Sequence, residues 1–246
     1  MMQALIFDCD GVLVDTERDG HRVAFNAAFA AAGLAREWSV ERYGALLHTA
    51  GGKERMRRDF DETGWPDATD GAGPDRGALI LNLHLRKTDL FMALIEGGAL
   101  PLRPGVARLV DQAMAAALPV AVCSTSNERA VQAVVDVLLG PERARHIRVF
   151  AGDIVARKKP DPAIYLLAAQ TFNLDPACCV VVEDSNIGLC AAKSAGMACI
   201  VTRSTYTMAE DFTIADLVVD DLEAGVDLGT CRRLLTVQPS GSLWRK

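Results

Sequence analysis

Two aspartates separated by one residue follow the first apolar run of the chain. The run Ala4–Phe7 ends directly before Asp8, Cys9 and Asp10. Side chains at positions i and i+2 of a strand point to the same side, so the two carboxylates would lie roughly 6–7 Å apart. At an effective dielectric constant of about 20, their repulsion costs about 2.5 kcal/mol. Such a pair favours a site that holds a cation, or one in which the two carboxylates act separately as nucleophile and as acid/base.

Further chemically capable side chains follow the later apolar runs. Ser124 comes after the second run, and Lys159 lies in the loop beyond the third. Glu183 and Asp184 end the fourth run. Ligands of open parallel sheets bind beyond the carboxyl ends of the strands, so we expect these groups to meet at one edge. Four carboxylates at one edge require a cation, and a ligand set made only of oxygen selects Mg²⁺ over zinc.

Each of these residues also has a simpler interpretation when it is taken alone. Asp10 and Gly11 are typical of a turn, whereas Asp15 and Ser124 are typical of helix N-caps. Lys159 alone would be a solvated surface charge. The order and spacing of the groups, each beyond the end of an apolar run, favour the functional interpretation.

Short β-type runs alternate with helical stretches along most of the chain. The β-type runs are Ala4–Phe7, Val120–Cys123, Val149–Ala151, Cys179–Val182, Cys199–Val201 and Leu217–Val219. The helical stretches are Gly105–Ala117, Asn127–Leu139, Asp161–Phe172, Asn186–Ala195 and Asp221–Leu235. Continuous apolar strands separated by helices predict a parallel sheet that is covered on both faces. We therefore expect an α/β fold with a Rossmann-like parallel sheet core.

The alternation is interrupted once, after the first strand. Residues 16 to about 98 contain helical patterns at Thr16–Ala32, Val40–Leu47, Lys53–Glu62 and Gly77–Ile95, with a loop at Asp67–Pro74. We expect an inserted helical cap domain of residues 16–98 within a core domain of residues 1–15 and 99–246.

Composition excludes several other classes of protein. The 246 residues are 50% hydrophobic, which excludes intrinsic disorder, and the formal net charge of −6 disfavours a nucleic-acid partner. No apolar run approaches the roughly 20 residues that span a bilayer, so we expect no membrane partner. The start lacks a secretory pattern, and the seven cysteines are expected to be free thiols, which together predict a cytoplasmic protein. We expect a monomer.

The residues singled out above match the motifs of a known enzyme family. In chain order, Asp8-Cys9-Asp10-Gly11, Ser124, Lys159-Pro160 and Glu183-Asp184-Ser185-Asn186-Ile187-Gly188 resemble the four motifs of the haloacid dehalogenase superfamily. The resemblance covers nearly the full length of the chain. The helical insertion is similar to the cap of the subgroup that contains β-phosphoglucomutase. Within that subgroup, the segment Leu47–Met56 resembles the CbbY proteins of carbon-fixing organisms.

The resemblance implies a mechanism for the core residues. Asp8 attacks phosphorus and becomes an aspartyl phosphate, while Asp10 protonates the leaving oxygen and then activates water. The Asp8 carboxylate, the Asp10 backbone carbonyl and Asp184 hold Mg²⁺, and Glu183 orients or completes this shell. Ser124, the amide of Thr125 and Lys159 hold the phosphoryl oxygens. Asn127 is a further expected substrate contact.

The helical insertion is expected to select the substrate. A basic run follows two glycines, and Gly51, Gly52, Lys53 and Arg55 are expected to bind an anion, because glycines that open a helix leave free amides. The alternative is a solvated helix face paired with Glu54 and Asp59. By resemblance, Glu17 and His21 contact sugar hydroxyls, whereas a packing role for His21 is an equal alternative. Tyr43 and His48 are further candidates.

The resemblance also implies a substrate. CbbY proteins are phosphatases that convert xylulose-1,5-bisphosphate, an inhibitor of rubisco in the Calvin cycle, into xylulose 5-phosphate and phosphate. A phosphosugar mutase of the β-phosphoglucomutase type is the alternative, because Thr16 occupies the hinge position of that enzyme. A signalling receiver also uses a phosphorylated aspartate, but receivers have no large insertion after the first strand.

Overall fold

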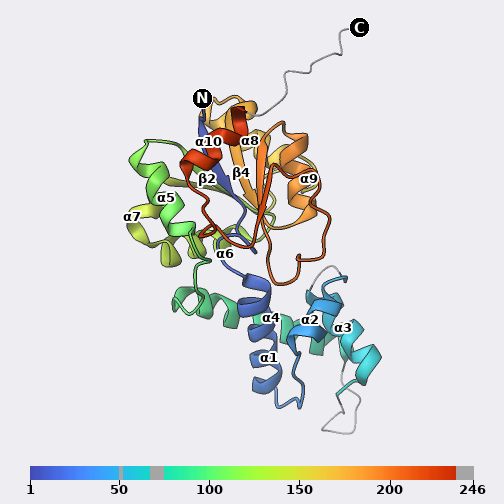
Figure 1. Cartoon of the computed structure of the whole chain (residues 1–246). Helices are drawn as coiled ribbons and strands as arrows, with labels where there is room; N and C mark the ends of the chain where they lie inside the picture. The colour runs from blue at the N-terminus through green and yellow to red at the C-terminus, as the bar shows by residue number, and fades with distance from the viewer. Residues whose placement is uncertain (50–51, 67–74, 237–246) are drawn as a thin grey trace. The chain divides into compact units, whose positions relative to one another are not determined.

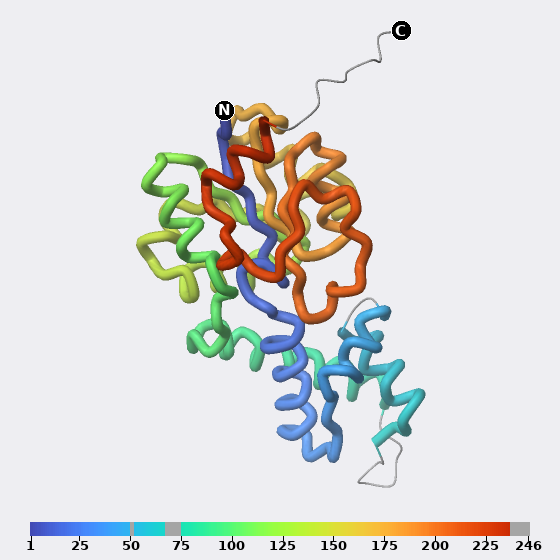
Figure 2. The backbone as a smooth tube through the Cα atoms, viewed as in Figure 1, coloured from blue at the N-terminus to red at the C-terminus, as the bar shows by residue number. Residues whose placement is uncertain are grey.

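The computed structural model describes residues 1–49, 52–66 and 75–236 (Figures 1 and 2). The chain divides into two compact units. The first, here called the sheet unit, consists of Met1–Asp15 and the chain from Pro101 onward. The second, the helical unit, consists of Thr16–Leu100. Each unit is built around its own buried apolar side chains.

The sheet unit contains one six-stranded parallel sheet. Its strands are β1 (Ala4–Phe7), β2 (Val120–Cys123), β3 (Ile147–Phe150), β4 (Cys179–Glu183), β5 (Ala198–Thr202) and β6 (Leu217–Val219). Their order across the sheet is β3-β2-β1-β4-β5-β6, and every neighbouring pair is parallel. The strands β2 and β3 thus lie on one side of β1, and β4, β5 and β6 lie on the other. The expected parallel α/β fold is confirmed, and its topological switch lies between β1 and β4.

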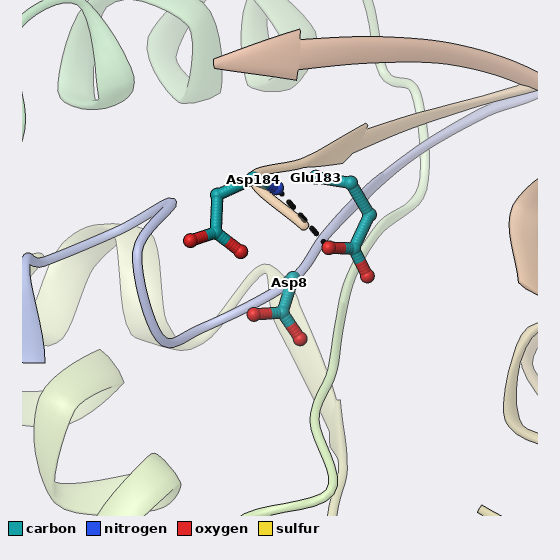
Figure 3. Close-up of side chains that lie close together, drawn as sticks. All are labelled: Asp8, Glu183 and Asp184. Carbon is teal, nitrogen blue, oxygen red and sulfur yellow. Dashed lines mark hydrogen bonds between the residues drawn. The ribbon is translucent and has the colours of Figure 1, made fainter. Parts of the chain in front are cut away.

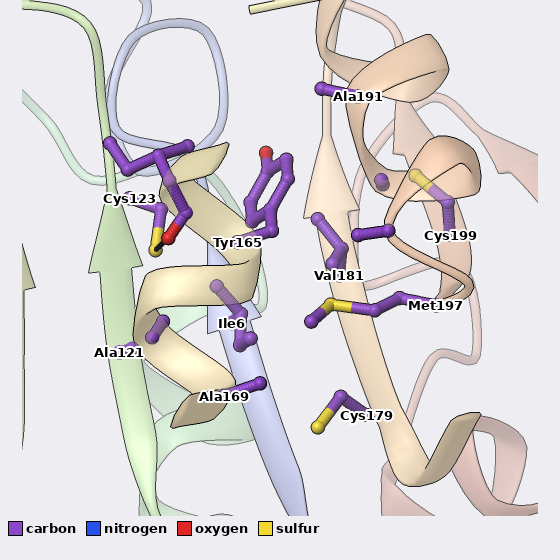
Figure 4. Packing of buried hydrophobic residues seen from close by; sticks show 14 of the residues in the cluster. Ile6, Ala121, Cys123, Tyr165, Ala169, Cys179, Val181, Ala191, Met197 and Cys199 are labelled. Atoms are coloured by element: carbon purple, nitrogen blue, oxygen red, sulfur yellow. Dashed lines mark hydrogen bonds between the residues drawn. The ribbon is translucent and has the colours of Figure 1, made fainter. Parts of the chain in front are cut away.

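Helices cover both faces of this sheet, as the continuous apolar strands predict. Helices α8 (Ala163–Phe172) and α9 (Asn186–Ser194) pack on one face, and α5 (Val106–Ala115) and α10 (Leu228–Thr236) contact strands and each other on the opposite face. Figure 4 shows Tyr165 and Ala169 of α8 beside Ile6 of β1 and Ala121 of β2. Burying a large aliphatic side chain such as Ile6 stabilises the fold by about 1.5–3 kcal/mol, and this packing holds the strand ends in place.

Two helical segments of the sheet unit differ from the ranges expected from sequence. The stretch expected to be one helix at Asn127–Leu139 consists of α6 (Glu128–Ala133) and the π-helical turn η2 (Val134–Leu138), followed by α7 (Gly140–Ala144). The helix expected at Asp221–Leu235 begins only at Leu228. The earlier residues form a turn in which Asp221 accepts a hydrogen bond from the amide of Ala224. Asp227 then accepts from the amide of Thr230 and caps the helix.

The helical unit contains the π-helical turn η1 (Thr16–His21) and helices α1 (Arg22–Ala31), α2 (Val40–Leu46), α3 (Gly52–Thr63) and α4 (Arg76–Glu96). These elements lie close to the helices expected from sequence, and the expected loop at 67–74 lies outside the described residues. The unit's core is an aromatic cluster of Phe25, Phe29, Trp38, Tyr43 and Phe60, all of which are fully buried. Neighbouring rings lie 4.7–6.2 Å apart between centroids.

All seven cysteines are free thiols, as the sequence predicts, and five of them are buried. In the parts of the chain that the structure describes, no helix is both long enough and apolar enough to span a membrane.

A buried ion-pair cluster in the helical unit leads to a stability prediction. The Asp59 carboxylate, 2% exposed, contacts Arg42 Nη2 at 2.6 Å and Arg36 Nη1 at 3.2 Å. We expect Asp59→Ala to lower the free energy of unfolding by about 2–3 kcal/mol, because it leaves two half-buried cations without this partner. Urea denaturation measures the loss. The control Asp111→Ala removes the exposed pair with Arg143 and should cost much less; equal losses would contradict this account.

Candidate active site

Three acidic side chains meet where β1 and β4 end (Figure 3). Asp8 follows β1, and its amide donates to Val182 O of β4 at 2.9 Å. Glu183 is the last residue of β4, and Asp184 follows it. One oxygen from each carboxylate lies within 4.8 Å of the others, and all three residues are buried. The site therefore lies at the topological switch point, where ligands of open α/β sheets bind.

Two glycines make room for these carboxylates. Gly11 has a φ of +77°, and a Cβ atom built on it would lie 1.9 Å from Asp184 Oδ2. A Cβ atom on Gly188, in the first turn of α9, would lie 2.0 Å from the carboxylate of Glu183. A side chain at either position would collide with the cluster. Glycine is therefore required at both positions, because any side chain there would occupy the space of the Asp184 or Glu183 carboxylate.

Lys159 reaches the cluster from the loop that follows β3. Its Nζ donates to Asp8 Oδ1 and to Glu183 Oε1, both at 2.6 Å, and to Cys123 O at 2.9 Å. The Lys159 side chain is only 6% exposed, so its interpretation as a solvated surface charge is wrong. Tyr165 OH also donates to Glu183 Oε1. Glu183 therefore holds Lys159 in position beside Asp8.

The side chains of this cluster carry an excess of negative charge. Three carboxylates face one ammonium group. Burial raises the pKa of Asp8 to about 8, with Glu183 and Asp10 adding to the effect and Lys159 opposing it. Burial, Glu183 and Asp8 raise the pKa of Asp184 well above its usual value. A hard divalent cation bound by the oxygens of Asp8 and Asp184 would remove this cost, so the residues present fit such an ion.

Asp10 lies two residues beyond Asp8 and contacts the loop after β2. Its Oδ2 accepts from Ser126 Oγ at 2.5 Å and from Ser124 Oγ at 3.4 Å. Ser124 is buried at the end of β2 and also accepts from the amide of Ser126. Ser126 was not among the expected site residues, although it lies two residues after Ser124, beyond the same strand.

The other expected contacts in this loop have local roles in the structure. Thr125 is exposed, and its carbonyl accepts from Lys158 Nζ at 3.5 Å. Asn127 caps α6 by accepting from the amide of Ala130. The structure therefore brings Asp8, Asp10, Ser124, Lys159 and Asp184 together, while substrate binding by Thr125 and Asn127 stays a prediction.

The substrate-selecting residues expected in the helical unit form two groups. In the first, Tyr43 OH donates to Glu17 Oε2 at 2.5 Å, and Arg55 Nη1 lies 3.1 Å from Tyr43 OH and 3.5 Å from Glu17 Oε2. In the second, His21 Nδ1 lies 3.0 Å from Lys87 Nζ.

The structure tests the alternatives for the basic run of α3. In the alternative, a solvated helix face, Asp59 would pair with this basic run. Asp59 instead contacts Arg36 and Arg42. Gly52 begins α3 and Lys53 is exposed, whereas Gly51 lies outside the described residues. The ring of His21 packs on Phe91 with centroids 3.9 Å apart, so a packing contact exists for His21. His48 is exposed.

Comparison with known proteins identifies the class of enzyme that this fold and site define. The model of the haloacid dehalogenase-like hydrolases matches residues 2–196, so the chain belongs to this family. It is therefore a hydrolase, with the family motifs at the carboxyl ends of β1, β2 and β4 and in the loop after β3.

Within this family, the chain is similar to CbbY proteins. It is 58% identical over 239 residues to a CBBY-like protein of Arabidopsis thaliana, covering 96% of this chain and 75% of that protein. It is 42% identical to protein CbbY of Rhodobacter capsulatus, covering 91% and 95% of the two chains. The crystal structure of CbbY from Rhodobacter sphaeroides in complex with phosphate matches with a TM-score of 0.76 at 39% identity, covering 94% and 100%. A mutant of that protein in complex with xylulose-(1,5)bisphosphate matches with a TM-score of 0.74 at 38% identity, covering 94% and 99%.

Because the cluster has an excess of negative charge, we expect the substitution Asp184→Asn to affect thermal stability differently with and without Mg²⁺. In the presence of a chelator, we expect Asp184→Asn to be at least as stable as the wild type, because it removes a buried acid beside two others. Added Mg²⁺ should raise the Tm of the wild type but not that of the variant. Thermal unfolding measures both effects. Asp153→Asn, at an exposed position, is the control and should keep the shift; a full Mg²⁺ shift in Asp184→Asn would contradict the assignment.

Proposed function

We propose that this hydrolase is a Mg²⁺-dependent phosphatase of sugar bisphosphates that acts through an aspartyl phosphate on Asp8. The observation that carries the proposal is the convergence on Asp8 of an ammonium group, a second carboxylate and a cation-requiring acidic cluster. A phosphoryl group placed between these residues would meet a nucleophile on one side and positive charge around its oxygens. Those are the requirements of phosphoryl transfer.

In the first step, an oxygen of Asp8 attacks phosphorus and the bond from phosphorus to the sugar oxygen breaks. Asp10 gives its proton to the departing oxygen. In the second step, Asp10 takes a proton from water as the water attacks phosphorus. The bond between phosphorus and Asp8 then breaks, which releases phosphate and restores the carboxylate. The Ser126 hydroxyl, 2.5 Å from Asp10 Oδ2, would hold this acid/base in place.

Charge on the phosphoryl oxygens is balanced by the groups around Asp8. Lys159 is held as a cation, because the carboxylates of Asp8 and Glu183 raise its pKa against the lowering effect of burial. With Ser124 it would donate to the phosphoryl oxygens. Bound Mg²⁺ would supply further positive charge, and its proposed ligands are the carboxylates of Asp8 and Asp184 and the backbone carbonyl of Asp10.

The proposed substrate is xylulose-1,5-bisphosphate, and the products are xylulose 5-phosphate and phosphate. The bisphosphate bound by the R. sphaeroides relative supports this choice. Charge in the helical unit supports it as well, because Lys53 and Arg55 lie in the first turns of α3, where helix amides and the helix dipole favour an anion. Arg55 already contacts Glu17, so Lys53 has the more available charge for a second phosphate. Glu17 and His21 are the proposed contacts to the sugar hydroxyls.

Substitution of the two aspartates tests the chemistry. We expect Asp8→Asn to abolish phosphate release, because the amide is not a nucleophile and binds a metal poorly. Asp10→Asn should lower kcat by roughly 10²–10⁴, the usual contribution of acid/base catalysis. Phosphate release from the bisphosphate under saturating Mg²⁺ measures both, with circular dichroism to verify folding. Wild-type turnover in Asp8→Asn would exclude the covalent mechanism, and isomerisation of a phosphosugar without phosphate release would favour the mutase alternative.

Substitution in α3 tests the choice of substrate. We expect Lys53→Ala to lower kcat/KM for the bisphosphate at least about tenfold, or about 1.4 kcal/mol, and to change that for sugar monophosphates little. Arg55→Ala should show the same selectivity with an added effect on Glu17. The control Arg86→Ala removes an exposed cation of α4 that donates to Ala31 O. Equal losses on both substrate classes would exclude a second phosphate site in α3.

A further inference from the structure

Arg103 joins the turn after β1 to the ends of two strands on the far side of the switch point. It lies on the segment that returns from the helical unit, just before α5. Its Nη1 donates to Gly11 O and, at 3.2 Å each, to the carbonyl and hydroxyl oxygens of Thr202 at the end of β5. Its Nη2 donates to Arg203 O at 2.6 Å and to Asp220 O at 2.7 Å. One side chain therefore binds five acceptors in four separate residues.

A guanidinium group suits this set of contacts. Its planar fork presents five N–H donors from separate nitrogen atoms in fixed directions, whereas a lysine ammonium offers three donors from one nitrogen and cannot serve five acceptors. The backbone of Arg103 adds a contact to the same turn, because its amide donates to Leu13 O at 2.8 Å. The turn from Asp10 to Val14 is closed by Gly11 N donating to Val14 O at 2.8 Å. Arg103 thus holds this turn at two carbonyls.

The turn that Arg103 holds is part of the acidic site. Gly11 follows Asp10 directly and lies against Asp184, where a Cβ atom would overlap the carboxylate. On the other side, Thr202 belongs to β5, which pairs with β4, and its hydroxyl lies 3.5 Å from Glu183 O. Arg103 therefore connects the strand-end segment that carries Asp10 to the strand pair that carries Asp184.

We propose that Arg103 is a positioning residue for the metal site, which it sets by fixing the Asp10–Gly11 backbone relative to Asp184. The inference rests on the proposed function, because it concerns the cation-binding geometry of the same site. Arg103 contacts neither the reacting carboxylate of Asp8 nor Lys159 in the described structure. It acts on the site through its hydrogen bonds to the turn and the strand ends, and its charge also interacts with the Asp184 carboxylate. Residues that orient metal ligands typically change metal affinity by roughly 10–100-fold when they are substituted.

The chain offers a matched control at Arg108 of α5. Arg108 Nη1 donates to Val226 O at 3.1 Å, and Nη2 donates to Leu222 O at 2.7 Å. Arg108 therefore also binds backbone carbonyls of the segment after β6, but its hydrogen bonds in the described structure are to Val226 and Leu222 and do not include the turn at Gly11. A purely structural role for Arg103 predicts that variants of both arginines lose stability and that neither loses metal affinity once folded.

The experiment measures Mg²⁺ affinity of the substrate-free protein by calorimetry, with kcat and KM at saturating Mg²⁺ and the Tm of each variant. We expect Arg103→Ala to weaken Mg²⁺ binding at least about tenfold and to lower kcat more than it changes KM. Arg103→Lys should recover only part of the affinity, and it replaces Arg103→Ala in the comparison if that variant does not fold. Arg108→Ala should bind Mg²⁺ as the wild type does, at a lower Tm.

Three results would overturn the inference in distinguishable ways. Wild-type Mg²⁺ affinity in folded Arg103 variants would show that Arg103 only stabilises the fold, and the proposed phosphatase would be unaffected. Absence of Mg²⁺ binding to the wild type would instead contradict the proposed metal site, and the inference would fail with it. Equal weakening in the Arg103 and Arg108 variants would assign the effect to general loosening of the sheet unit.

Discussion

The contact of Lys159 with Asp8 and Glu183 is the interaction on which the rest of the site depends. Without this ammonium group, three buried carboxylates would face one another where β1 and β4 end. Lys159 compensates one of these charges, and the remaining excess of negative charge fits a divalent cation. The parallel sheet creates this congestion, because it places Asp8 and Asp184 on adjacent strand ends at the switch point. The same congestion is what allows the site to hold a phosphoryl group beside a carboxylate nucleophile.

The sequence was sufficient to predict the sheet and the residues at its strand ends. Buried parallel strands are continuous apolar runs, so the first polar residues after them, such as Asp8, Ser124 and Asp184, mark the strand ends. The helix expected at Asp221–Leu235 was predicted to begin too early. Apolar periodicity does not show that the residues before Leu228 form a turn and not a helix. Asp227 caps the real helix start, which a capping signal would have indicated.

The positioning contacts could not be predicted, since they join residues that are far apart in the sequence. Nothing in the local pattern around Tyr165 indicates that its hydroxyl reaches Glu183, and nothing around Arg103 indicates that its side chain binds Gly11. The pairing of Arg55 with Glu17 is of the same kind and changes which cation of α3 is available to a substrate. Sequence patterns identify the groups that do chemistry, whereas the folded structure shows which side chains hold them in place.

Trapping the phosphorylated enzyme would show directly whether Asp8 is the nucleophile. The full-length protein would be mixed with Mg²⁺ and a bisphosphate labelled in its phosphoryl groups, quenched in acid during turnover, and digested for peptide mapping. We predict acid-stable, base-labile label on the peptide that contains Asp8, appearing before steady-state phosphate release. Label on another peptide, or unlabelled protein at every quench time during active turnover, would contradict it.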